Sequence, residues 1–294
     1  MIPKEILKAL RKIEITSSRL ANEQQLSGNY KSAILGQGLA FQEVRPYQAG
    51  DDVRTIDWNV SARMNEAFIK VFSEEREMTV MLIVDVSKSE LFGSTAMSKR
   101  RLATEVAALC AFSAISHNDR VGLIATSDVV EKLVPPQKGK KHGMRVLREI
   151  LELEPQRRGT DLRPGLETLM HVAKRRTIAF LISDFMTEGY ERTLALASAR
   201  HDIIPIFLTD PRDLELPNVG LAHFEDLETG EDIVIDTSSK KVREAIRASV
   251  LASRQRQLQG FRKLGLDTVT VSTAEPYFRP LRDLFARRAK KVSR

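Results

Sequence analysis

Short unbroken apolar runs that alternate with helical patterns restrict the fold of this chain more than any other feature. The runs cover residues 79–84, 120–126, 177–183 and 203–208. The segments between them repeat apolar residues at helical spacing, over 98–116, 142–153, 162–174 and 190–200. A strand that is apolar throughout is typical of a parallel sheet covered by helices on both faces. The alternation therefore predicts an α/β domain over residues 78–294, with a doubly wound, mostly parallel sheet flanked by helices.

Two hairpins are expected to interrupt this alternation. Residues 129–134 should pair with the strand over 120–126, and residues 221–236 should form an inserted hairpin within 214–237 that turns at Thr229-Gly230. The chain then returns to the α/β pattern. It has a predicted helix over 240–264, a strand over 268–272 and a final helix over 277–290.

The first 77 residues do not follow the α/β pattern and are predicted to form a separate N-terminal segment. A helix is expected over 3–25, followed by a loop rich in Gly and Ser over 27–40. Residues 66–73 read as a strand, because they are rich in β-branched and aromatic side chains. The intervening residues 41–63 match neither periodicity. We therefore expect a helix and β appendage on the α/β domain, with the boundary near residue 77.

The basic charge of the chain is concentrated near its end. Lys and Arg number 46 against 39 Asp and Glu, which gives a net charge of +7. Residues 281–294 hold six Lys or Arg and one Asp, a net of +5, so the preceding 280 residues carry only +2. A nearly neutral body argues against a broad nucleic-acid-binding face. Nucleic-acid binding through the basic tail stays an alternative function.

A single cysteine excludes an internal disulfide and a cysteine metal cluster. Cys110 lies in an apolar run and is expected to be buried. The N-terminus mixes charged and apolar residues, unlike a signal peptide, and no apolar run is long enough to span a bilayer. We therefore expect a cytoplasmic protein without a membrane span.

Oxygen-bearing side chains follow the predicted strands at three places. Asp85, Ser87 and Ser89 come after the run 79–84, Thr160 precedes a helix, and Asp184 follows the run 177–183. The carboxyl ends of parallel strands share one edge of the sheet, where ligands bind. Hydroxyls and carboxylates without His or Cys suit Mg²⁺, Mn²⁺ or Ca²⁺. The alternative is structural, with the hydroxyls and Asp161 capping helices and Asp184 an ordinary loop carboxylate.

This pattern resembles the metal-ion-dependent adhesion site of von Willebrand factor A domains. Those sites have Asp-x-Ser-x-Ser after a strand, a Thr before a helix and an Asp after another strand, and the matching residues here are Asp85, Ser87, Ser89, Thr160 and Asp184. The resemblance implies that these residues bind Mg²⁺, or Mn²⁺ or Ca²⁺. It also implies that the ion leaves one coordination position for a carboxylate of a partner protein.

A second resemblance covers roughly residues 30–210 and depends on a string upstream of the predicted sheet. The string contains Arg45-Pro46-Tyr47, Gly50-Asp51-Asp52, Arg54, Ile56-Asp57-Trp58 and Ser61-Ala62-Arg63. It is similar to the signature of a bacterial family of unknown biochemical function that has a von Willebrand A-like domain. That family is commonly encoded beside MoxR-type AAA+ ATPases, which implies such an ATPase, or its client, as the partner. Many of its members carry membrane spans, which this sequence does not show.

The physical role of this signature segment has two interpretations. Its alternating Arg and Asp residues could form an ion-paired latch that fastens the N-terminal segment to the sheet, with Trp58 as the apolar anchor. It could instead be a docking surface, because Arg and Trp are frequent in interface hot spots. The composition favours the latch.

Enzyme motifs are absent from the sequence. It has no Walker A motif and no Gly-x-Ser-x-Gly elbow, and its five His residues show no metal-ligand spacing. With these motifs absent, the two resemblances imply a metal-dependent interaction module without catalytic activity, acting as an adaptor or co-chaperone in the assembly or maturation of other proteins. A Mg²⁺-dependent hydrolase of phosphate esters is the other alternative, although no general base stands beside the predicted site.

Overall fold

The computed structural model of the chain describes residues 40–64, 66–73, 78–87, 97–157, 159–225 and 232–292. Several predictions concern residues outside these ranges. They are Ser89, the helix over 3–25, nearly all of the loop over 27–40 and the turn at Thr229-Gly230.

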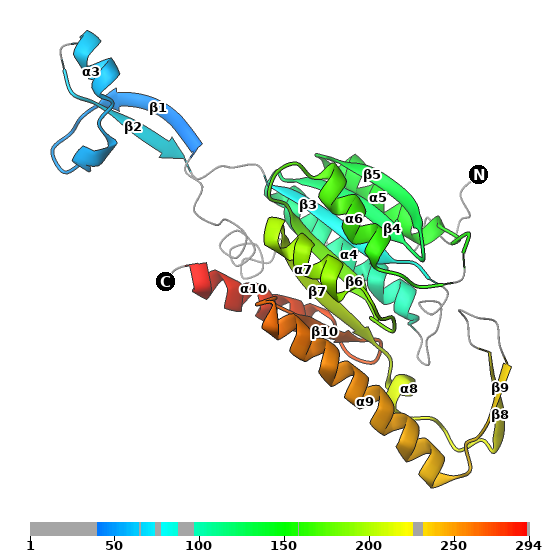
Figure 1. Ribbon diagram of the computed structural model, residues 1–294. Helices are drawn as coiled ribbons and strands as arrows, with labels where there is room; N and C mark the ends of the chain where they lie inside the picture. The colour runs from blue at the N-terminus through cyan, green and yellow to red at the C-terminus, as the bar shows by residue number, and fades with distance from the viewer. Residues whose placement is uncertain are drawn as a thin grey trace.

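A six-stranded sheet forms the centre of the molecule, with the order β10-β7-β6-β3-β4-β5 (Figure 1). Its strands are β3 (Thr79–Asp85), β4 (Arg120–Thr126), β5 (Val130–Gln137), β6 (Ile178–Ser183), β7 (Asp202–Thr209) and β10 (Val269–Ser272). Neighbouring strands are parallel except β5, which pairs antiparallel with β4. The predicted mostly parallel sheet and the pairing of 129–134 with 120–126 are therefore confirmed.

Helices cover both faces of this sheet. One face packs against α4 (Lys99–Ser116), α5 (Lys140–Glu152) and α10 (Phe278–Val292), and the other against α6 (Arg163–Val172), α7 (Glu191–Arg200) and α9 (Lys240–Lys263). Successive residues of β3 serve different faces, since Leu82 packs in the first core and Ile83 in the second. Strands β3, β4, β6 and β7 are therefore buried on both faces of the sheet, which explains the unbroken apolar runs in the sequence.

Cys110 lies on α4 inside the first core, fully buried as predicted. Burial raises the pKa of its thiol well above the usual range. The thiolate is the nucleophilic form, so this cysteine is a core residue and not a reactive one.

Residues before β3 form a small β unit that lies apart from the central sheet in Figure 1. Its strands β1 (Ala40–Pro46) and β2 (Phe68–Ser73) pair antiparallel, and η1 (Val53–Thr55) and α3 (Trp58–Met64) lie between them in the chain. The strand predicted over 66–73 is confirmed as β2. The two short helices and β1 were not predicted, because residues 41–63 lack a clean period.

Two antiparallel strands, β8 (Leu221–Glu225) and β9 (Asp232–Asp236), lie within the range predicted for a hairpin. They follow the short helix α8 (Pro211–Leu214) and lead into α9. Figure 1 shows this pair beyond the sheet, near the first turns of α9. Among the described helices, none has the length and apolar character needed to cross a membrane.

Candidate functional site

The candidate site lies where the chain reverses its direction of winding across the sheet. From β3 the chain moves to β4 and β5 on one side, and later to β6, β7 and β10 on the other. The carboxyl ends of β3 and β6 are therefore neighbours at a topological switch point, which is where open α/β sheets bind ligands. Asp85 ends β3 and Asp184 follows β6, and their exposed fractions are only 1% and 2%.

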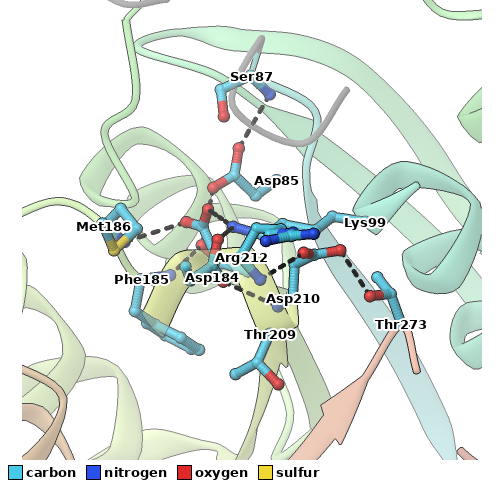
Figure 2. A network of polar contacts seen from close by, with 12 residues as sticks. Asp85, Ser87, Lys99, Asp184, Phe185, Met186, Thr209, Asp210, Arg212 and Thr273 are labelled. Carbon is cyan, nitrogen blue, oxygen red and sulfur yellow. Dashed lines mark hydrogen bonds and ion pairs between the residues drawn. The ribbon is translucent and has the colours of Figure 1, made fainter. Parts of the chain in front are cut away.

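Asp85 is held by hydrogen bonds from both strand ends (Figure 2). The backbone N–H of Ser87 donates to Oδ1 at 2.9 Å, and the hydroxyl of Ser183 donates to Oδ2 at 2.7 Å. Burial, and then the nearby carboxylate of Asp184, raise the pKa of Asp85 from 3.8 to about 6. The hydrogen bonds from Ser87 and Ser183 oppose this rise. A divalent cation beside Asp85 would remove the repulsion between the two carboxylates.

Asp184 faces a buried lysine. Its Oδ2 lies 3.0 Å from Nζ of Lys99, and its Oδ1 accepts a hydrogen bond from the backbone N–H of Met186 at 3.0 Å (Figure 2). The same ammonium lies 2.9 Å from Oδ1 of Asp213, and the Lys99 side chain is only 4% exposed. Asp184 is therefore part of a buried ion-paired network and not an ordinary loop carboxylate.

The backbone beside Asp184 is constrained. Phe185 has a φ of +54°, a left-handed conformation that is unusual for a residue with a bulky side chain. Its ring is buried against Phe207 and Phe261, with ring centroids 5.1 Å away in both cases, and its N–H donates to the Ser183 hydroxyl at 2.9 Å. Gln257 of α9 donates to the Phe185 carbonyl. Packing and hydrogen bonds thus hold a turn that fixes the direction of Asp184.

Thr160 supplies a buried hydroxyl in the loop before α6. Its backbone oxygen accepts a hydrogen bond from the hydroxyl of Thr187, three residues after Asp184, at 2.9 Å. The residue is 9% exposed, and in the described part of the chain its Oγ1 has no hydrogen-bond partner. An unpartnered buried hydroxyl is costly and calls for an explanation such as a bound ion or water.

A glycine lets α6, which follows this loop, pack closely against the sheet. A Cβ on Gly165 would lie 3.1 Å from Ile83 and 3.2 Å from Thr126, both near the carboxyl ends of their strands. Larger residues at this position would push the start of α6, and with it the loop of Thr160, away from the sheet.

Helix capping does not account for the candidate hydroxyls that the structure describes. Ser98, not Ser87, caps α4, with its hydroxyl accepting from the N–H of Arg101. Helix α6 has no side-chain cap at its N-cap residue, Leu162. Asp161 does accept from the N–H of Arg163 at 2.8 Å, so the structural interpretation holds for Asp161 but not for Thr160.

The donor set fits a hard divalent ion. Asp85 and Asp184 provide carboxylates, and Ser87 and Thr160 provide hydroxyls, from loops that meet at one edge of the sheet. In the described ranges, no three His, Cys, Asp or Glu residues gather into a metal-binding group. An ion here would therefore depend on hydroxyl oxygens as well as carboxylates, which suits Mg²⁺, Mn²⁺ or Ca²⁺ and not Zn²⁺. Ser89, the fifth predicted ligand, lies outside the described residues.

Three residues of this network were not singled out in the sequence: Ser183, Lys99 and Asp213. A signal for Lys99 does exist. The first turn of α4 holds Lys99, Arg100 and Arg101 and no acidic residue, so three cations stand at the positive end of a helix. A buried ammonium there needs carboxylates, and for Lys99 the structure supplies Asp184 and Asp213 from elsewhere in the fold.

The structure of the signature segment, residues 45–63, argues against the interpretation of this segment as a latch. Its ion pair exists, because Arg45 and Asp51 form a bidentate contact at 2.8 and 2.7 Å. Trp58, however, is 72% exposed, and Val53 and Met64 are also exposed, at 61% and 59%. A side chain with this exposure cannot be the apolar anchor of a latch. The exposed aromatic favours the docking interpretation, since Trp is enriched in interface hot spots.

The basic charge is distributed differently from the sequence-based estimate. Helix α9 holds eight Lys or Arg residues and one Glu, a net of +7, and only Phe261 among its residues is buried. The 280 residues before the tail are thus nearly neutral only as a sum. A long basic helix is offset by a net acidic remainder.

Comparison with known proteins identifies the family. A family model described as "Protein of unknown function DUF58" matches residues 43–256. The chain belongs to this family. An uncharacterized protein of Mycobacterium tuberculosis is 35% identical over 225 residues, which cover 76% of this chain and 71% of that protein. An uncharacterized protein of Mycobacterium bovis matches to the same extent.

Two solved structures with partial likeness to this DUF58 chain have TM-scores below 0.5. An aerotolerance-related membrane protein from Bacteroides fragilis is 15% identical, with a TM-score of 0.48, and the match covers 73% of this chain and 99% of that one. The VWA domain of SpRpn10 is 14% identical, with a TM-score of 0.39, over 71% and 94% of the two chains. The description of the fold therefore rests on the order and direction of the strands given above.

Proposed function

We propose that this protein is a metal-dependent protein-interaction module. Mg²⁺, or Mn²⁺ or Ca²⁺, would be held by Asp85, Ser87, Thr160 and Asp184, with Ser89 as the remaining predicted ligand. The observation that carries the proposal is the buried, unpartnered hydroxyl of Thr160, placed beside the loop of Asp184 at the switch point of the sheet. When bound, the ion would supply a coordination position for a carboxylate of a partner protein.

The described side chains support a role without catalysis. Cys110 is buried in the core, and His142 uses its Nε2 in a 2.9 Å contact with the backbone oxygen of Val121. The described polar partners of the two aspartates include hydroxyls, backbone N–H groups and an ion-paired lysine. The Ser183 hydroxyl donates to the carboxylate of Asp85, but both groups are buried, so this pair is not placed to attack a substrate. We therefore propose binding, and not hydrolysis, as the activity.

The proposed partner is a MoxR-type AAA+ ATPase, or a client of it, that presents an Asp or Glu to the metal. In this role the protein would act as an adaptor or co-chaperone during assembly or maturation of other proteins. Two exposed surfaces could contribute to the same complex. The basic helix α9 suits an acidic partner surface, and the exposed Trp58 suits an apolar one.

Binding of the purified chain to a purified MoxR-type ATPase from the same organism tests this proposal. Biolayer interferometry in Mg²⁺ and in EDTA should show binding that disappears in EDTA and in Asp85→Asn, a variant that keeps the shape of the side chain. Asp283→Asn, at an exposed carboxylate, is the matched control and should bind like wild type. Binding that is equal in EDTA, or unchanged in Asp85→Asn, would remove the metal from the proposal. Absence of binding under every condition would remove this partner.

A further inference from the structure

Lys99 occupies an unusual position for a cation. It is the first residue of α4, and its ammonium lies 3.0 Å from Asp184 and 2.9 Å from Asp213, with the side chain 4% exposed. A buried ammonium is tolerated only when it is paired. Here it is paired with two carboxylates that come from different loops, one after β6 and one in α8.

The carboxylate of Asp213 also caps helix α8. Oδ2 of Asp213 accepts the backbone N–H of Asp210 at 2.8 Å and so completes the capping box of α8. Asp210 in turn accepts the hydroxyl of Thr273, at the end of β10, at 2.6 Å (Figure 2). The ammonium of Lys99 therefore joins the candidate metal site to a polar network that continues across β7, α8 and β10.

We propose that Lys99 is a resident cation that competes with the divalent ion for Asp184, and that it thereby sets metal affinity and couples the site to α8. This inference rests on the metal site of the proposed function. A divalent ion and an ammonium repel each other, so both cannot share one carboxylate oxygen at full strength. Ion binding would weaken the contact of Lys99 with Asp184, keep its contact with Asp213, and so release the connection between Asp184 and α8.

The coupling must act in both directions. If the ion weakens the contact of Lys99 with Asp184, then whatever strengthens that contact weakens ion binding by the same factor. A partner that moves α8, and with it Asp213, would thus change metal affinity from a distance. Lysine suits displacement from Asp184 by an ion better than arginine would, because its ammonium is a compact charge on a flexible stem.

Calorimetric titration of the full chain with Mg²⁺ or Mn²⁺ tests the competition. We expect Lys99→Met to bind at least tenfold more tightly than wild type, because the ammonium no longer competes with the ion for Asp184. Asp213→Asn should bind more weakly, because Lys99 loses its contact with the Asp213 carboxylate and then pairs more strongly with Asp184. Lys132→Met removes an exposed lysine that pairs with Glu149, and it should leave the affinity unchanged. Equal or weaker binding by Lys99→Met would overturn the inference.

Hydrogen exchange of the wild-type chain provides a second readout that needs no variant. Saturation with the ion should speed exchange several-fold at the backbone of residues 210–215, where α8 loses its connection to Asp184. Unchanged exchange there at saturation would mean that Lys99 does not move. A lysine with a purely structural role predicts that unchanged result.

The titrations also separate this inference from the proposed function. If wild type and Lys99→Met bind the ion equally, the metal site stands and the role of Lys99 is lost. If Lys99→Met binds and wild type does not, competition by Lys99 is supported and the metal-dependent function of the wild type fails. If no variant binds at millimolar metal, both proposals fall.

Discussion

The carboxyl edge of the central sheet and the β1–β2 unit differ in the burial of their side chains: the first buries charged groups, and the second exposes apolar ones. At the sheet edge, Asp85 and Asp184 are almost fully buried and are satisfied by hydroxyls, backbone N–H groups and Lys99. In the β1–β2 unit, the large apolar side chains of Trp58 and Val53 face solvent. The first region pairs buried charges inside the fold, although the carboxylate of Asp184 still raises the pKa of Asp85. The second leaves these two large apolar side chains exposed.

The largest expected effect is at the buried lysine. In metal-free buffer, Lys99→Met should lower the free energy of unfolding by about 3–5 kcal/mol, because it removes the ammonium that pairs with the buried carboxylate of Asp184. Urea denaturation measures the change. Lys132→Met, at a pair whose lysine is 42% exposed, should change stability by less than about 1 kcal/mol. A similarly small change for Lys99→Met would mean that the ion pair of Lys99 at the sheet edge stabilises the fold no more than an exposed ion pair does.

A pH-dependent effect is expected at Asp85. Its pKa is about 6 in the folded protein and 3.8 as the ordinary value, so the folded state binds the proton more tightly. Ionisation of Asp85 therefore lowers stability as the pH rises from about 4 to about 6, by about 3 kcal/mol in metal-free buffer. Above pH 6 the full loss of stability from ionised Asp85 is present, and below pH 4 this loss disappears.

Denaturation of wild type and Asp85→Asn across this pH range measures the contribution of Asp85. The variant should lack the fall in stability between pH 4 and 6, whereas Asp283→Asn, at an exposed carboxylate, should keep the wild-type profile. Parallel profiles for wild type and Asp85→Asn would show that Asp85 is not the buried, repelled carboxylate described above.

The smallest stability effect is expected at Trp58. Because this side chain is 72% exposed, Trp58→Ala should change the free energy of unfolding by no more than about 0.5 kcal/mol. The same variant should weaken binding to the proposed partner, if that surface is a hot spot. A loss of about 3 kcal/mol or more, as expected for a buried aromatic, would restore the latch interpretation.

The difference between these regions also explains what the sequence could predict. Strands buried on both faces must be apolar throughout, so β3, β4, β6 and β7 were visible as runs, and the residues following them could be placed at one edge. The exposure of Trp58 depends on which surfaces its unit contacts, and no local pattern encodes that. Lys99 was missed for a similar reason. Its partners Asp184 and Asp213 are distant in sequence, and only the packing of α4 decides that the Lys99 ammonium reaches them.

Binding of Mn²⁺ is the most direct measurement of the central claim, that carboxylates and hydroxyls at the switch point hold a divalent ion. Electron paramagnetic resonance of free Mn²⁺ during titration with the full chain counts bound ions. We expect a single Mn²⁺ site in wild type that is lost in Asp85→Asn. The site should be weakened at least tenfold in Thr160→Val, which removes the unpartnered hydroxyl and keeps the side-chain shape. Wild type that binds no Mn²⁺ at millimolar concentration, or equal binding by wild type and Asp85→Asn, would contradict the claim.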